Sequence, residues 1–123
     1  MPDKIFDIGE RTKEFAVRIV RFCSKMDNSI ASREIAKQLI RSGTSVGANL
    51  QEASGSISKK EFISKVGISR KEAKETTYWL DIIQRSKLLK NQQNVQELSS
   101  LLIESEEISK ILSSIIIKAR SKP

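Results

Sequence analysis

Residues 31–54 read ASREIAKQLIRSGTSVGANLQEAS, and this stretch decides the fold class. Its apolar side chains recur every three or four residues, which is the period of one face of an α-helix. Two such stripes lie side by side: Ile35, Leu39, Val46, Leu50 and Ala53 form the first, and Ala36, Ile40, Gly43 and Gly47 form the second. Because glycine inside a helix costs about 1 kcal/mol relative to alanine, we expect another backbone to approach closely at Gly43 and Gly47.

The rest of the chain shows the same period in three further segments, so the sequence predicts an all-α protein. We expect helices at about residues 9–26, 31–54, 59–88 and 94–119, with a mobile or docked lead at residues 5–8. The third helix opens with the capping box Ser58-Lys59-Lys60-Glu61. Four amphipathic helices joined by short polar turns predict one up-down-up-down four-helix bundle spanning residues 1–123.

The residue inventory excludes most familiar catalytic centres. The 123 residues include no His and a single Cys, which removes His-based zinc sites, Ser-His-Asp triads and Cys-His dyads. We therefore expect no enzymatic activity, no metal and no cofactor. Cys23 lies in an apolar run and is expected to be a small buried hydrophobe rather than a reactive thiol. A lone cysteine, with no apolar run near the ~20 residues of a membrane span, predicts a cytoplasmic protein without a membrane or export segment.

A stripe of polar residues runs along one flank of the second helix and continues on the third. Arg41, Ser45, Asn49 and Glu52 fall on that flank, and the third helix offers Glu72, Glu75 and Trp79. One interpretation is a site in which the carboxylates, Arg and Asn hold a divalent cation or a phosphate. The favoured interpretation is architectural, with Arg41 paired to Glu72 or Glu75 and with Ser45 and Asn49 bonding across helices. Because so many sides of the second helix are occupied, we expect it to contact another subunit.

The net charge of +7 is concentrated in one segment of the chain. Residues 57–90 hold 9 Lys and Arg against 4 Asp and Glu, a net of +5. Basic side chains with an interleaved aromatic residue are typical of surfaces that hold phosphates and stack a base, although a charged face is also what any soluble helix needs. The candidate nucleic-acid-binding residues are Lys59, Lys60, Arg70, Lys71, Lys74, Tyr78 and Arg85. Tyr78 and Trp79 are alternatively an aromatic pair at an interface.

Three strings carry a family resemblance: RSGTSVGANLQEA at residues 41–53, SKKEF at 58–62 and KEAKETTYWL at 71–80. They resemble the bacterial four-helix-bundle family of proteins encoded by intervening sequences of 23S rRNA genes, in which Gly often stands at the position of Ala53. The resemblance implies a left-handed bundle that assembles into a ring-shaped homopentamer. The sequence is also similar to the accessory bundle proteins of diversity-generating retroelements, which implies binding of nucleic acid and of a reverse transcriptase. Five copies would carry 5 × 7 = 35 positive charges.

These observations favour a homo-oligomeric bundle that binds the RNA or DNA backbone through the basic face of the third helix. The alternative is a protein-interaction module whose positive charge is incidental. A third and least favoured hypothesis is an enzyme that uses Glu52, Glu72 and Glu75 around a metal.

Overall fold

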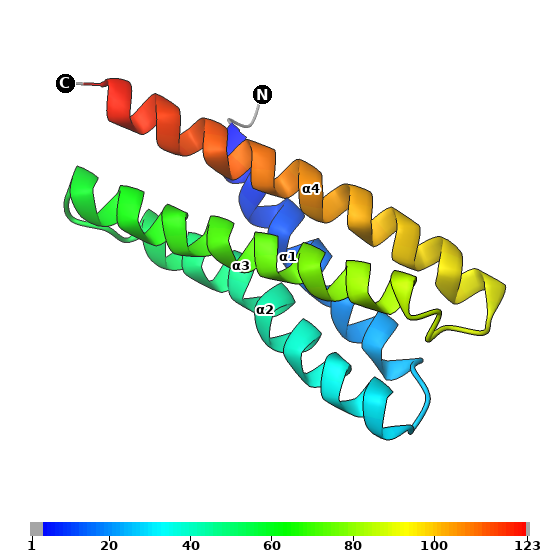
Figure 1. Ribbon diagram of the computed structural model, residues 1–123. Coiled ribbons are helices and arrows are strands. Elements are labelled where there is room, and N and C mark those ends of the chain that lie inside the picture. The colour runs from blue at the N-terminus through cyan, green and yellow to red at the C-terminus, as the bar shows by residue number, and fades with distance from the viewer. Residues whose placement is uncertain (1–3, 123) are drawn as a thin grey trace.

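The computed structural model describes residues 4–122, with side chains from residue 8 onward. Four helices make up the regular structure of this range: α1 (Lys4–Ser24), α2 (Ile30–Ser54), α3 (Lys59–Arg85) and α4 (Gln92–Ser121). Figure 1 shows them as four rods joined by short turns, and no strand occurs among the described residues. The prediction of an all-α, four-helix protein is confirmed.

The helices pack in an up-down-up-down bundle. Each packs against its neighbour in the chain, and α1 also packs against α4 (Figure 1). Two ion pairs join α1 to α4: Arg11 Nε lies 2.7 Å from Glu104 Oε2, and Arg18 Nη2 lies 3.2 Å from Glu97 Oε1. The residue number rises along α1 as it falls along α4, so these two helices are antiparallel.

Side-chain caps fix where three of the helices begin. The Ser29 and Ser58 hydroxyls accept hydrogen bonds from the amides of Ser32 and Glu61, each at 3.1 Å. The side chain of Asn91 accepts from the Gln93 amide at 2.8 Å. These bonds satisfy amides that have no partner within the helix. The predicted cap at Ser58 is confirmed.

Several predicted helix ends were wrong. The lead at residues 5–8 is helical, because α1 begins at Lys4 rather than residue 9, and α1 ends at Ser24 rather than residue 26. α3 ends at Arg85 rather than residue 88, because Lys87 adopts a left-handed backbone conformation with φ of 54°. The Leu88 amide then bonds back to the Ile83 carbonyl at 3.4 Å, as in a Schellman motif. α4 extends from Gln92 to Ser121, beyond the predicted 94–119 at both ends.

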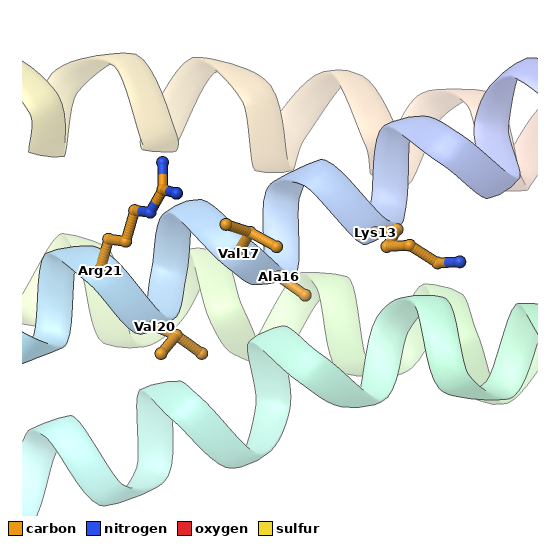
Figure 2. Close-up of a pocket in the computed structure, with 5 residues that line it drawn as sticks. All are labelled: Lys13, Ala16, Val17, Val20 and Arg21. Atoms are coloured by element: carbon orange, nitrogen blue, oxygen red, sulfur yellow. The ribbon is translucent and has the colours of Figure 1, made fainter.

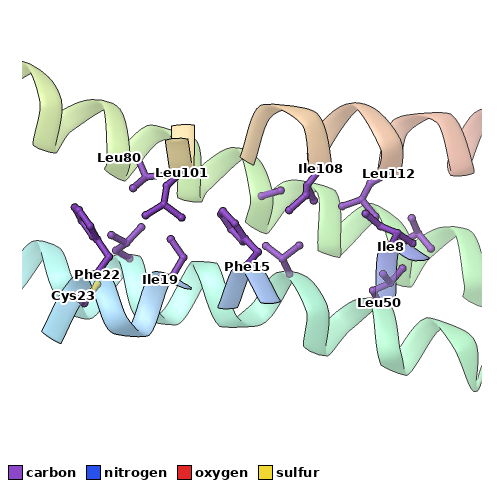
Figure 3. Packing of buried hydrophobic residues seen from close by; sticks show 14 of the residues in the cluster. Ile8, Phe15, Ile19, Phe22, Cys23, Leu50, Leu80, Leu101, Ile108 and Leu112 are labelled. Atoms are coloured by element: carbon purple, nitrogen blue, oxygen red, sulfur yellow. The ribbon is translucent and has the colours of Figure 1, made fainter. Parts of the chain in front are cut away.

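All four helices contribute to one hydrophobic core. In Figure 3, Phe22 lies near Leu80 and Leu101, and further along the core Ile8 lies near Leu112. Cys23 belongs to this core, as predicted, and burial raises the pKa of its thiol to about 12.

The two interior glycines of α2 make room for α1 of the same chain. A Cβ atom on Gly43 would lie 2.9 Å from Ile19 Cγ2, and one on Gly47 would lie 3.1 Å from Thr12 Oγ1. The predicted close approach of another backbone is confirmed at Gly47, where the Thr12 carbonyl carbon would lie 3.5 Å from the Cβ, whereas at Gly43 the near atoms belong to the Ile19 side chain. Both contacts bring α1 and α2 together, so these glycines give no argument for a second subunit.

Replacing Gly43 with alanine is expected to destabilise the protein by about 1–3 kcal/mol, because the added methyl overlaps the branched part of Ile19. The matched control is Gly9→Ala, where a Cβ would meet no atom within 4 Å. This control is expected to gain up to about 1 kcal/mol from helix propensity. Urea denaturation followed by circular dichroism measures both changes, and equal stability gains in the two variants would contradict the close contact.

Candidate functional site

Arg41 on α2 and two glutamates on α3 form the centre of the polar stripe. The Arg41 guanidinium contacts Glu75 and lies 3.4 Å from Glu72 Oε2. Trp79 Nε1 donates a hydrogen bond to Glu75 Oε2 at 3.2 Å. Burial raises the pKa of Glu75, but the hydrogen bonds from Trp79 and Arg41 outweigh it, so the pKa lies below its ordinary value. The predicted ion pair between Arg41 and these glutamates is confirmed, and it joins α2 to α3 within one chain.

Ser45 and Asn49 do not bond across helices, so that part of the prediction was wrong. The Ser45 hydroxyl donates to the Arg41 carbonyl at 2.6 Å, and the Asn49 amide donates to the Ser45 carbonyl at 2.8 Å. Each bond runs back one turn of α2. In a helix, a short polar side chain can donate a hydrogen bond to the carbonyl four residues earlier, which is nearer than the groups of a neighbouring helix.

Buried hydroxyl groups make further hydrogen bonds between helices, in addition to the arginine and lysine pairs. The Ser69 hydroxyl donates to the Val46 carbonyl at 2.6 Å, and the Thr76 hydroxyl donates to the Ser42 hydroxyl at 3.0 Å. The Thr77 hydroxyl lies 2.6 Å from the Ser105 hydroxyl on α4. Sequence analysis missed them, although Ser69 and Thr76 fall between the apolar core positions of α3 in the same three-to-four residue period.

The three acidic residues of the stripe are engaged in ion pairs and do not gather in one cluster. Glu52 pairs with Lys65 at 3.0 Å, while Glu72 and Glu75 are engaged with Arg41. Within the described part of the chain, no three Asp, Glu or Cys side chains gather where they could hold a metal ion. The second carboxylate oxygen of Glu72 is buried and has no hydrogen-bond partner among the described atoms.

The outward side of α3 carries most of the predicted nucleic-acid-binding residues. We call Lys60, Lys71, Lys74, Tyr78 and Arg85 the α3 outer face, because helix geometry places them within an arc of about 60°. Lys60, Lys71 and Lys74 are exposed, and no carboxylate among residues 8–122 lies within ion-pair distance of them. Tyr78 is 57% exposed, and its ring makes an edge contact with Trp79 at a centroid distance of 5.2 Å. The two rings are thus in contact, while their predicted place at an interface stays a prediction.

Three of the predicted basic residues are already engaged. The Lys59 ammonium donates to the Lys122 carbonyl, which holds it toward the end of α4. Arg70 is half-buried and donates to the Ser113 hydroxyl on α4 at 3.4 Å, so it does not belong to the outer face. Arg85 stays on that face, but Asp81 lies 3.1 Å away and offsets part of its charge.

A second surface lies on α1, on the side turned away from the core. Figure 2 shows Ala16, Val17 and Val20 together in a shallow hollow, with Lys13 and Arg21 at its two ends. Val17 and Val20 are 40% and 45% exposed. We call this surface the α1 apolar face. Sequence analysis missed it, although two valines on the side opposite the core residues Phe15 and Ile19 are the signal that marks it.

The sequence strings and the four-helix fold agree with one family model, that of the 23S rRNA-intervening sequence protein, which matches residues 4–114. The chain belongs to this family. This member of the 23S rRNA-intervening sequence family is similar to a solved structure from Bacteroides thetaiotaomicron VPI-5482, a protein of unknown function from the S23 ribosomal protein family. The two share 39% sequence identity with a TM-score of 0.82, over 93% of this chain and 98% of that one. Among curated proteins, none matches this family member.

In the part of the chain that the structure describes, no helix has the length and apolar character needed to cross a bilayer.

Replacing Arg41 with alanine is expected to raise the pKa of Glu75, because the carboxylate loses a hydrogen bond and a positive charge while its burial remains. Trp79 is the one tryptophan of the sequence and bonds to Glu75, so its fluorescence reports the titration. In the unmodified protein the acid midpoint should lie below the ordinary value of 4.5, and in Arg41→Ala it should shift upward. Arg33→Ala removes an exposed arginine of the same helix and serves as the control. The same midpoint in all three proteins would contradict this coupling.

Proposed function

We propose that this family member is a non-enzymatic, homo-oligomeric bundle that binds the backbone of RNA or DNA through the α3 outer face. It acts in the cytoplasm as an accessory or scaffold factor. The observation that carries the proposal is the exposure of Lys60, Lys71 and Lys74 together on one side of α3, with no described carboxylate in ion-pair contact. The family name refers to 23S rRNA, which supports an RNA-related role.

The distribution of ion pairs supports this assignment. Arg11, Arg18 and Arg41 are paired with carboxylates that join one helix to another. The positive charge of these arginines is therefore offset by carboxylates of the same chain. The lysines of the α3 outer face have no such partner, so their field is directed outward, where phosphate groups would replace small counterions.

We further propose a left-handed bundle and a homopentamer as the working form, as the family resemblance implies. The α1 apolar face supports self-association, because it leaves Val17 and Val20 exposed opposite the core. Five copies would have a mass of 5 × 13.9 = 69.5 kDa and a net charge of 5 × 7 = +35. Such an assembly would present five α3 outer faces to one polyanion.

The same α1 apolar face favours a second candidate function, a protein-interaction module. In that case α1 binds a different protein, and the positive charge of α3 only keeps the chain in solution. Purification from the native host separates the two candidates. Nucleic acid in the purified particle supports the first, and a stoichiometric protein partner without nucleic acid supports the second.

Nucleic-acid affinity is expected to fall steeply with salt. Three phosphate contacts on a single strand predict a slope of about −2 in log affinity against log salt for each protomer. Changing Lys60, Lys71 and Lys74 to glutamate lowers the net charge from +7 to +1 and should reduce affinity at least about tenfold. Fluorescence anisotropy with a labelled oligonucleotide measures both quantities.

The control variant changes Lys25, Arg33 and Lys37 to glutamate, which are exposed residues away from α3. It also has a net charge of 7 − 6 = +1, so a difference between the two triple variants depends on position and not on total charge. Equal losses in both variants would show that the α3 outer face is not the binding surface. Binding that is insensitive to salt would contradict a phosphate-contact mechanism altogether.

Light scattering of the purified protein is expected to give a mass near 69.5 kDa, five times 13.9 kDa. Changing Val17 and Val20 to glutamate should reduce this mass, because two buried, unpaired carboxylates would oppose association through the α1 apolar face. The control is the pair Ile103→Glu and Ile117→Glu, which alters apolar and more exposed positions on α4. A mass of 13.9 kDa for the unmodified protein would contradict the oligomer, and an unchanged mass for the valine variant would exclude α1 as the contact.

A further inference from the structure

Gly67 lies in the interior of α3, and nothing described in the protein packs against it. A Cβ atom at this position would meet no other atom within 4 Å, whereas Gly43 and Gly47 make room for α1. Glycine in a helix interior destabilises the helix by about 1 kcal/mol relative to alanine. Gly67 therefore lowers the stability of α3, and no contact within the described protein offsets this loss.

The position of Gly67 relates it to the α3 outer face. At about 100° per residue, Gly67 falls within the same arc as Lys60, Lys71 and Tyr78. Along the helix axis it lies about 10 Å beyond Lys60 and about 6 Å before Lys71. Lys60 and Lys71 thus flank one helix position that has no side chain. At this half-buried glycine, no side chain covers the peptide backbone of α3 between the two positive charges.

Such a surface fits a linear polyanion better than a compact anion. A glycine allows the backbone of a ligand to approach the helix closely, and lysines on either side can contact successive phosphates. Tyr78 lies about 17 Å further along the same face, with more than half of its side chain exposed. Its edge contact with Trp79, which Glu75 in turn holds, fixes the orientation of the ring. A fixed, exposed aromatic ring can stack with an unpaired base but not with a base inside a duplex.

We propose that a single strand of RNA or DNA lies lengthwise on α3, with its sugar–phosphate backbone seated on Gly67 between Lys60 and Lys71 and one base stacked on Tyr78. This inference rests on the proposed function and adds the path of the strand and its single-stranded character. The inference also gives a reason for glycine at position 67, where alanine would make the helix more stable.

The test uses Gly67→Ala and Gly67→Leu in the full chain, with labelled oligouridine and oligothymidine of about 20 nucleotides as probes. Both substitutions should raise the thermal unfolding temperature, because alanine and leucine favour the helix and a Cβ at this position meets no atom within 4 Å. Both should weaken binding, about threefold for alanine and about tenfold for leucine, because the added atoms push the strand off the helix. Gain of stability with loss of affinity is a combination that a purely structural role would not produce.

Two controls accompany these variants. Gly9→Ala fills an equally open helical glycine on α1 and should raise stability while leaving affinity unchanged. Tyr78→Ala should weaken binding of the single strand about fivefold or more, and the unmodified protein should bind a duplex of the same length more weakly. Equal affinity for duplex and single strand would overturn the single-strand assignment.

The remaining outcomes separate this inference from the proposed function. If the unmodified protein binds the probes but both Gly67 variants bind equally well, the seat at Gly67 is wrong and the proposed function stands. If the unmodified protein binds neither probe, both the inference about Gly67 and the proposed function are wrong. If Gly67→Leu changes the particle mass in light scattering, Gly67 faces another subunit, and the inference is overturned.

Discussion

The rotational position of α3 about its own axis is the constraint on which the rest of the structure depends. Toward α2, the hydroxyls of Ser69 and Thr76 bond to the Val46 carbonyl and to Ser42. Toward α4, Thr77 bonds to Ser105. Apolar contacts alone tolerate some rotation of a helix, whereas buried hydroxyls that lose their partners are left unsatisfied. These bonds on both flanks therefore hold α3 in one orientation, and that orientation decides which residues face outward.

Once α3 is fixed, two of its glutamates and two of its lysines lie on different sides of the helix. Glu72 and Glu75 lie on the flank toward α2, where Arg41 pairs with both of them and Glu75 also accepts a hydrogen bond from Trp79. Lys60 and Lys71 lie on the outer face, where no described carboxylate pairs with them. The ion pair between α2 and α3 thus has two effects. It joins the helices, and it keeps Glu72 and Glu75 occupied at the edge of the α3 outer face.

Hydrophobic periodicity was sufficient to predict four helices and their order, because burial of one apolar face per helix leaves few other ways to pack. Charge spacing was also sufficient to predict the ion pair of Arg41 with Glu72 and Glu75. The errors arose where a polar side chain has two partners within reach. Ser45 and Asn49 bond to their own helix because that carbonyl is nearer, and the interhelical role belongs to hydroxyls at core positions. The end of α3 depends on a left-handed residue, Lys87, that is not a glycine and so gives no signal in the sequence.

The proposed assembly changes what a weak basic surface can do. Three unpaired lysines on one protomer hold a strand loosely, because each exposed contact in water contributes little. When protomers are linked in one particle, a strand bound by the first α3 outer face meets the second at high effective concentration, and the affinities combine without any new contact. The salt dependence then measures how many faces one strand touches, since each adds about −2 to the slope for three phosphate contacts. A slope of about −2 for a long strand means that one protomer acts alone, while a slope near −10 means that the strand follows the whole ring. One titration against salt therefore reports how many α3 outer faces a single strand contacts.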